Sequence, residues 1–205
     1  MANSNSPFGF KFLRSLDGEN KLNARGKYTI ASAYGSKITR GEAVVLAGAG
    51  SSVAGHVDGI TIARGAGTSE QVIGVFDSCS YIDSTGKRFD NVHYWPASQT
   101  LLSGTACTVN VYDVTGSLFL VQGDSGSWVA ADIGLNVDYT PGTASGAKAQ
   151  SVITRTGINT TDTLMCRLVS FAPENLLVDG TNELGAYAKF VVQFNANAYT
   201  TRTGA

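Results

Sequence analysis

Four consecutive residues, Gly123-Asp124-Ser125-Gly126, carry the strongest chemical signal in the chain. A serine hydroxyl is a weak nucleophile, and it needs a base to take its proton and an acid to orient that base. The chain has two histidines, His56 and His93, and both precede Ser125. Acidic residues lie between His56 and Ser125. The order base, acid, nucleophile is therefore available, and Ser125 is a candidate catalytic residue.

The sequence around these residues argues against a trypsin-like hydrolase, which uses that order. In that family the base ends a short Ala-His-Cys motif after an apolar strand, whereas His56 lies between glycines in "SSVAGHVDG". His93 has aromatic neighbours in "NVHYWPA", as in a half-buried sheet position. After Gly126 the chain has Ser127 and Trp128 in place of that family's glycine and proline. We expect no enzyme, and keep a hydrolase using Ser125 with His56 as the alternative.

A turn explains the same four residues better. "SLFLVQ" alternates apolar and polar residues before them, and "SWVAAD" does so after them. Aspartate and glycine tolerate the backbone angles of tight turns. The sequence therefore predicts a hairpin whose turn residues are Gly123, Asp124 and Gly126, with Gly126 in a conformation that other residues avoid.

No other motif for a bound group is present in the sequence. The chain has no complete dinucleotide-binding fingerprint, no Walker A lysine, no Cys-x-x-Cys and no His-Glu-x-x-His. Its three cysteines are far apart and odd in number, which excludes a full disulfide framework. We expect no cofactor, no metal, and buried free thiols in a protein made in a reducing cytoplasm.

Charge and hydropathy give no reason to expect nucleic acid or membrane as partners. Charged residues make up 15% of the 205 residues, and the formal net charge is −1. A nearly neutral chain lacks the basic surface that attracts phosphates. No run of 18 apolar residues occurs, and the start "MANSNSPFGFKF" lacks the pattern of a signal peptide.

Alternating apolar residues and β-branched clusters dominate the chain and predict an all-β fold. Glycine, serine and asparagine clusters separate the candidate strands, as in an antiparallel sandwich or barrel, jelly-roll-like in type. The predicted strands are Lys27–Ser32, Glu42–Ala47, Gly59–Ala63, Gln71–Phe76, Cys107–Val114, Ser117–Gln122, Thr163–Phe171 and Ala188–Asn195.

We place the β-rich domain at 17–205. Two segments of the chain differ in composition from its predicted strands. Residues 1–16 are predicted to form an extended N-terminal arm, and residues 136–162, rich in small polar side chains, a long exposed loop with at most a short strand at "AQSVI". In an extended arm Phe8, Phe10 and Phe12 fall on one side. They could pack on this protein's own barrel or add a strand to a neighbouring subunit.

Four stretches together resemble the head decoration, or cement, proteins of tailed bacteriophages. The N-terminal stretch is "PFGFKFLRSLDG" (Pro7–Gly18), and the middle carries "VIGVFDSCSYID" (Val72–Asp83). The most telling stretch is "DIGLNVD" (Asp132–Asp138) before a Thr/Gly/Ser-rich segment. The end, Leu164–Tyr199, contains "GAYAKF" and an asparagine-rich close. The resemblance covers most of the chain, although no single motif is as specific as a metal site.

The resemblance implies a structural virion protein on the outer capsid surface, made in the host bacterial cytoplasm. Its partners would be the major capsid protein, whose neighbouring subunits it would cement, and itself, as a homotrimer at three-fold positions. The arm would be the chief adhesive element, with Phe8, Phe10, Lys11 and Phe12 as the capsid-binding residues. Another phage tail or surface module remains an alternative.

Overall fold

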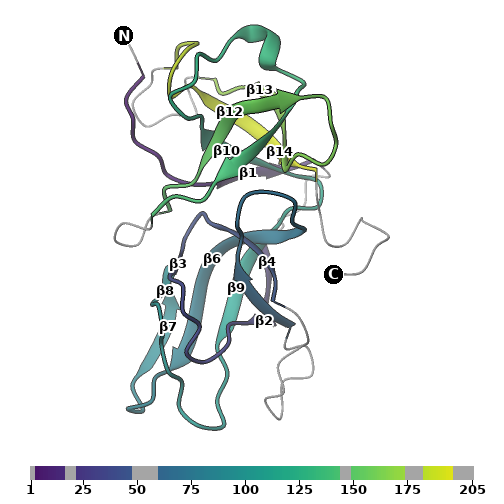
Figure 1. Cartoon of the computed structure of the whole chain (residues 1–205). Coiled ribbons are helices and arrows are strands. Elements are labelled where there is room, and N and C mark those ends of the chain that lie inside the picture. The colour runs from purple at the N-terminus through teal and green to yellow at the C-terminus, as the bar shows by residue number, and fades with distance from the viewer. Residues whose placement is uncertain (1–2, 17–21, 48–59, 144–148, 174–181, 196–205) are drawn as a thin grey trace.

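The computed structural model describes residues 3–16, 22–47, 60–143, 149–173 and 182–195. These residues form fourteen strands and one short 3₁₀ turn at Ala130–Asp132, and no α-helix occurs among them. Two stacked lobes are visible (Figure 1). The all-β fold predicted from the alternating pattern is therefore confirmed.

One lobe, here called the barrel lobe, contains a closed sheet. Its order is β4-β5-β2-β9-β6, and pairing of β4 with β6 closes the ring. All of these pairs are antiparallel except β2 with β5, which is parallel. β7 extends the sheet from β6, and β3 and β8 form a separate two-stranded sheet. The bounds are β2 Leu22–Thr29, β3 Ile38–Thr39, β4 Ala43–Leu46, β5 Ile60–Arg64, β6 Val72–Ile82, β7 Arg88–Val92, β8 Tyr94–Trp95 and β9 Thr108–Asp113.

The other lobe, here called the sheet lobe, is a curled antiparallel sheet of order β1-β10-β14-β13-β11-β12. A single parallel bridge joins Gly123, directly after β10, to Ile153 on β12, so the sheet curls back on itself. The bounds are β1 Lys11–Ser15, β10 Ser117–Gln122, β11 Asn136–Thr140, β12 Val152–Asn159, β13 Cys166–Phe171 and β14 Lys189–Phe194.

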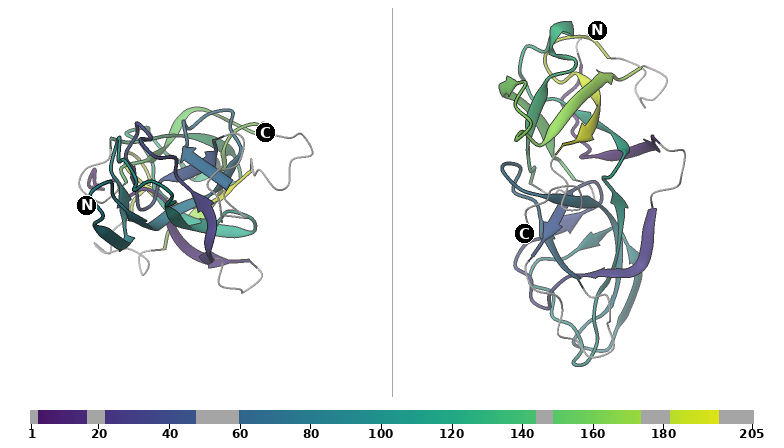
Figure 2. Two further views of the ribbon diagram at one scale, coloured as in Figure 1. Left: turned by 90° about the horizontal axis from the view of Figure 1, so that it is seen from below. Right: turned by 90° about the vertical axis from the view of Figure 1, so that its right-hand side faces the viewer.

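The chain begins in the sheet lobe, passes through the whole barrel lobe and returns (Figures 1 and 2). The barrel has a core of its own, which includes Tyr28, Ile62 and Trp95. A second core fills the sheet lobe and takes in Ala43 and Val72 of the barrel strands. Because the two lobes share this second core, they are packed on each other and not merely linked.

The N-terminal segment does not form a separate arm in this structure. β1 pairs with β10 from Lys11 opposite Leu120 to Ser15 opposite Ser117. Phe10 is 2% exposed and lies in the shared core, and Phe12 stacks on Tyr112 with ring centroids 4.8 Å apart. The prediction of an extended arm separate from the domain is wrong for residues 11–15, which belong to the sheet, and Phe10 and Phe12 find their apolar surface within this chain.

The three phenylalanines also do not share one side. Phe8 packs against Leu118 and Leu120, a cluster separate from the one that holds Phe10 and Phe12. Between Phe8 and Phe10, Gly9 has φ +72°, which interrupts the alternation of an extended strand. A Cβ on Gly9 would lie 2.6 Å from the Gly41 carbonyl oxygen, so the chain passes there at a distance that only glycine allows.

The region predicted as a long exposed loop, 136–162, contains two paired strands instead. Tyr139 of β11 lies opposite Ile153 of β12, and both side chains are buried. In "NVDYT" Val137 and Tyr139 alternate with polar residues, which is the signature of a half-buried strand. The small polar composition of the segment concealed that alternation.

Candidate functional site

The Gly-Asp-Ser-Gly segment leaves the end of β10 but does not form the predicted hairpin. No strand follows it: the chain runs through Trp128 into the 3₁₀ turn at Ala130–Asp132. The hairpin prediction is wrong, because the N–H groups of Gly123 and Asp124 donate to the Ala188 and Ile153 carbonyls instead of pairing with the residues that follow. The indole of Trp128 is 1% exposed, and its ring centroid lies 4.8 Å from that of Phe190. The indole also fills the space beside Gly123, where a Cβ would lie 2.5 Å from Nε1.

Asp124 is held by main-chain groups of three segments. Its Oδ1 accepts from the Gly126 N–H at 2.9 Å, and its Oδ2 accepts from the Arg155 N–H at 3.2 Å. Its own N–H donates to the Ile153 carbonyl, and its carbonyl accepts from Tyr187 N–H, both at 2.9 Å. Asp124 therefore fixes the start of the segment against β12 and the approach to β14.

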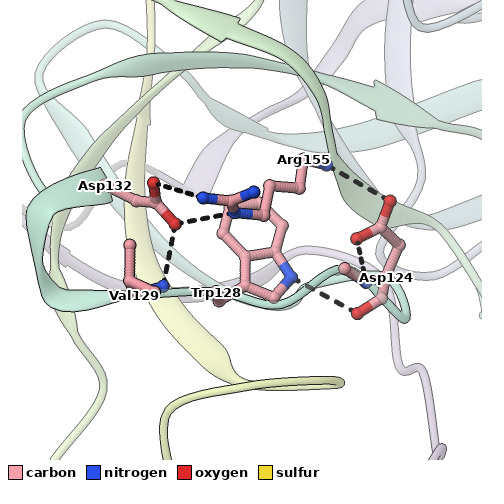
Figure 3. A network of polar contacts seen from close by, with 6 residues as sticks. Asp124, Trp128, Val129, Asp132 and Arg155 are labelled. Atoms are coloured by element: carbon pink, nitrogen blue, oxygen red, sulfur yellow. Dashed lines mark hydrogen bonds and ion pairs between the residues drawn. The ribbon is translucent and has the colours of Figure 1, made fainter.

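An ion pair between a half-exposed arginine and a buried aspartate holds the far end of the same segment (Figure 3). Arg155 Nε and Nη2 donate to Asp132 Oδ2 and Oδ1 at 2.9 and 3.1 Å. Asp132 Oδ2 also accepts from the Val129 N–H at 2.9 Å. The two side chains are 32% and 5% exposed, and hydrogen bonding to Asp132 raises the pKa of the Arg155 guanidinium. This two-pronged geometry is the strong form of a charged hydrogen bond.

Ser125 is exposed, and no hydrogen bond joins it to a described histidine. His93 lies between β7 and β8 in the barrel lobe, where its Nδ1 is 3.1 Å from the Asp77 carbonyl oxygen. His56, the other candidate base, lies outside the described residues. The structure thus brings Asp124 and Gly126 together around Ser125 as a loop, and leaves His93 in the other lobe.

Gly126 does not have the positive φ that the sequence predicted, so that part of the prediction is wrong. The position requires glycine for space: a Cβ there would lie 2.8 Å from both Arg155 Cβ and Asp124 Oδ1. Because the Asp124 carboxylate accepts the Gly126 N–H, neither neighbour can withdraw without breaking the loop's hydrogen bonds.

We expect Gly126→Ala to lower the free energy of unfolding by about 1–3 kcal/mol through this overpacking. A suitable control is Gly35→Ala, where a Cβ would meet nothing within 4 Å and φ is not positive. Urea titration of both variants measures the difference. Equal stability of the two variants would contradict the crowding seen at Gly126.

A second polar cluster joins the two lobes, and sequence reasoning did not find it. Arg64 Nη2 lies 2.6 Å from Glu42 Oε1 and also donates to the carbonyl of Gly142 in the sheet lobe. Glu70 Oε1 accepts from the Tyr139 hydroxyl at 2.5 Å. Burial raises the pKa of the Glu42 carboxyl, although Thr39 N–H and Arg64 oppose this. These residues are far apart in sequence, so no local spacing could reveal the cluster.

No group of three or more histidine, cysteine, aspartate or glutamate side chains that could hold a metal ion occurs among the described residues. In the same part of the chain, no helix has the length and apolarity needed to cross a membrane. The polar clusters found above are made of ion pairs and main-chain hydrogen bonds. What they do is fix loops in place.

Comparison with protein-family models, with curated proteins and with solved structures gave no match.

Proposed function

We propose that this protein is a structural component of a phage virion, which binds the outside of the capsid and cements neighbouring major capsid protein subunits. The observation that supports this proposal is that polar side chains hold loops in place. The carboxylates of Asp124, Asp132 and Glu70 each accept hydrogen bonds from backbone N–H groups. Such side chains stiffen a scaffold. The proposal also rests on the sequence resemblance described above.

The contact with the capsid has to be reassigned, because Phe10 and Phe12 are used inside this chain. Lys11 remains exposed on β1. The segment after Gly126 offers a better candidate, because Val129, Ala130 and Ala131 are three consecutive exposed apolar residues. Val129 is 44% exposed, and the Asp132–Arg155 pair fixes the turn that carries it. A fixed apolar turn loses little conformational entropy when a partner covers it.

Co-sedimentation with capsids that lack decoration tests this assignment. We propose Val129→Glu as the disrupting variant, because burying a carboxylate against a partner is unfavourable. Leu184→Glu is the matched control, since Leu184 is 50% exposed and also lies in the sheet lobe. Loss of binding with Val129→Glu alone supports the contact. Equal binding by both variants would remove this turn from the proposal.

A reconstruction of particles with and without the protein tests the role itself. Density at three-fold symmetric positions on the outer shell is expected, with three copies in contact, because decoration of this kind repeats with the shell symmetry. Density along the tail would instead favour the alternative of a tail or surface module. Absence from purified particles would overturn both.

The serine hydrolase alternative makes its own prediction. Because no described histidine reaches Ser125, we expect no labelling by a fluorophosphonate probe and no change in capsid binding in Ser125→Ala. Intact-mass analysis after exposure to the probe is the measurement, with a known serine hydrolase as the positive control. Stoichiometric labelling that disappears in Ser125→Ala would reverse the proposal in favour of an enzyme.

A further inference from the structure

Strand β7 forms an open edge of the barrel sheet. Among the described residues it pairs with β6 alone, and it lies at the end of the barrel lobe that is away from the sheet lobe (Figure 1). An open edge presents main-chain N–H and C=O groups that can pair with a further strand. Proteins usually keep such edges apart with charged side chains, so the charges on β7 decide what it can accept.

The hydrogen bonds around β7 show which of its main-chain groups face outwards. The Ile82 carbonyl, on β6 opposite Arg88, accepts from the Leu102 N–H and so points away from β7. In such a pair the main-chain groups of Arg88 also point away from the partner strand. Asn91 N–H points inwards, because it donates to a serine hydroxyl of β6 at 2.9 Å. Since the direction alternates along a strand, the main-chain groups of Asp90 face the open edge together with those of Arg88.

The side chains at this edge are opposite in charge and face the solvent. Arg88 and Asp90 are 73% and 58% exposed, and Arg88 Nε lies 2.8 Å from Asp90 Oδ2. Between them Phe89 turns to the other face of the sheet, where its ring stacks on Tyr81 with centroids 4.9 Å apart and packs against the barrel core. The edge is therefore fixed before any partner arrives, and little conformational entropy is lost when it is covered.

We propose that two copies of this protein pair along β7, antiparallel, across a two-fold axis at Phe89. In this register Arg88 of each copy lies opposite Asp90 of the other, and the two residues exchange both main-chain hydrogen bonds. Their side-chain charges are complementary as well, which is favourable for residues directly opposite each other on neighbouring strands. The two-fold axis forms both Arg88–Asp90 pairs at once.

The other two edge strands of the large sheets lack this self-complementarity. β1 exposes Lys11 and Arg14, so two copies of β1 would bring positive charges together. β12 contains no acidic residue, and its one basic side chain, Arg155, already pairs with Asp132. Because like charges on opposing strands are unfavourable, a second copy should select β7.

The contact is small, and it is separate from the proposed capsid contact. A single pair of short strands buries little surface, and interfaces of that size are transient, so the association should grow as the protein concentration rises. β7 belongs to the barrel lobe, whereas Val129 lies in the sheet lobe. The pairing therefore does not rest on the proposed function, and it can be tested without capsids.

Sedimentation velocity of the full-length protein, from micromolar to millimolar concentration, measures the association. Arg88→Asp sets carboxylates opposite each other in the pair, and Asp90→Arg sets guanidinium groups opposite each other. Each single variant should raise the dissociation constant at least about tenfold. An equimolar mixture of the two variants should recover the association, because opposite charges then face each other again. Arg14→Asp, on the exposed edge strand β1, is the matched control and should associate like the natural protein.

Amide hydrogen exchange locates the contact. The N–H groups of Arg88 and Asp90 should become more protected as the protein concentration rises, whereas those of β1 should not change. Both side chains are exposed, so the variants should keep the fold, and their melting temperatures check this. No association over this range, equal association of the single variants and the natural protein, or a mixture that does not recover it would each overturn the proposal. Failure of capsid binding would leave this result unchanged.

Discussion

Replacing Phe10 with alanine is expected to lower the free energy of unfolding by about 3–5 kcal/mol. The ring lies with its centroid 4.8 Å from Phe194, 5.3 Å from Tyr139 and 6.5 Å from Phe119. Its removal leaves a cavity in the core that the two lobes share, and the fixed backbone at Gly9 and Gly41 limits how far the chain can collapse into it. Urea or thermal unfolding measures the loss.

Phe8→Ala is the matched control, because Phe8 is half-buried on the smaller cluster and should lose clearly less stability. Deleting Met1–Phe12 should likewise prevent stable folding, whereas a free adhesive arm could be removed without harm. If Phe10→Ala keeps the stability of the natural protein and loses only capsid binding, the arm is an anchor after all and its place in the core is wrong.

Much of the fold could be predicted because alternation is a local property. The strand predicted at Ser117–Gln122 is present with the same bounds, and those at Glu42–Ala47 and Cys107–Val114 differ by one residue at each end. Short strands such as β3 and β8, with two residues each, offer too few positions for alternation to be visible. β11 was not predicted because the small polar residues of segment 136–162 favoured a loop over the alternation of apolar and polar residues in this short strand.

The division into two lobes could not be predicted, since it depends on which strands pair. β1 joins β10, more than a hundred residues later, and nothing in the local sequence of either strand encodes that partner. The polar contacts around the Gly-Asp-Ser-Gly segment were likewise only partly predictable from local sequence. Asp124 and Gly126 were found as loop residues, but Asp132 and Arg155 were missed because their pairing brings together two segments that are not adjacent in sequence.

One conformational detail overturned an expectation about the N-terminal segment. The rule that side chains alternate predicted one aromatic face for Phe8, Phe10 and Phe12, and hence an adhesive arm. Gly9, with φ +72°, breaks that rule at one residue and sends Phe8 to the opposite side of β10 from Phe10. A glycine inside an apparent strand is therefore a reason to doubt alternation across it.

Arg155→Met should lower the free energy of unfolding clearly more than the loss of an exposed ion pair does, because it leaves the Asp132 carboxylate, 5% exposed, with the Val129 N–H as its one remaining hydrogen-bond donor among the described residues. The loss should be smaller than for a fully buried pair, because the Arg155 side chain is 32% exposed.

The matched control for that prediction is Arg88→Met. Arg88 pairs with Asp90 at 2.8 Å, but these side chains are 73% and 58% exposed, so the change should cost less than about 1 kcal/mol.

Arg155→Met combined with Asp132→Leu should recover part of the loss, because the uncompensated charge is then gone. If Arg155→Met also weakens capsid binding and the double variant does not restore it, the exact placement of Val129–Ala131 matters for attachment. If Arg155→Met changes stability no more than Arg88→Met, the ion pair does not hold this loop.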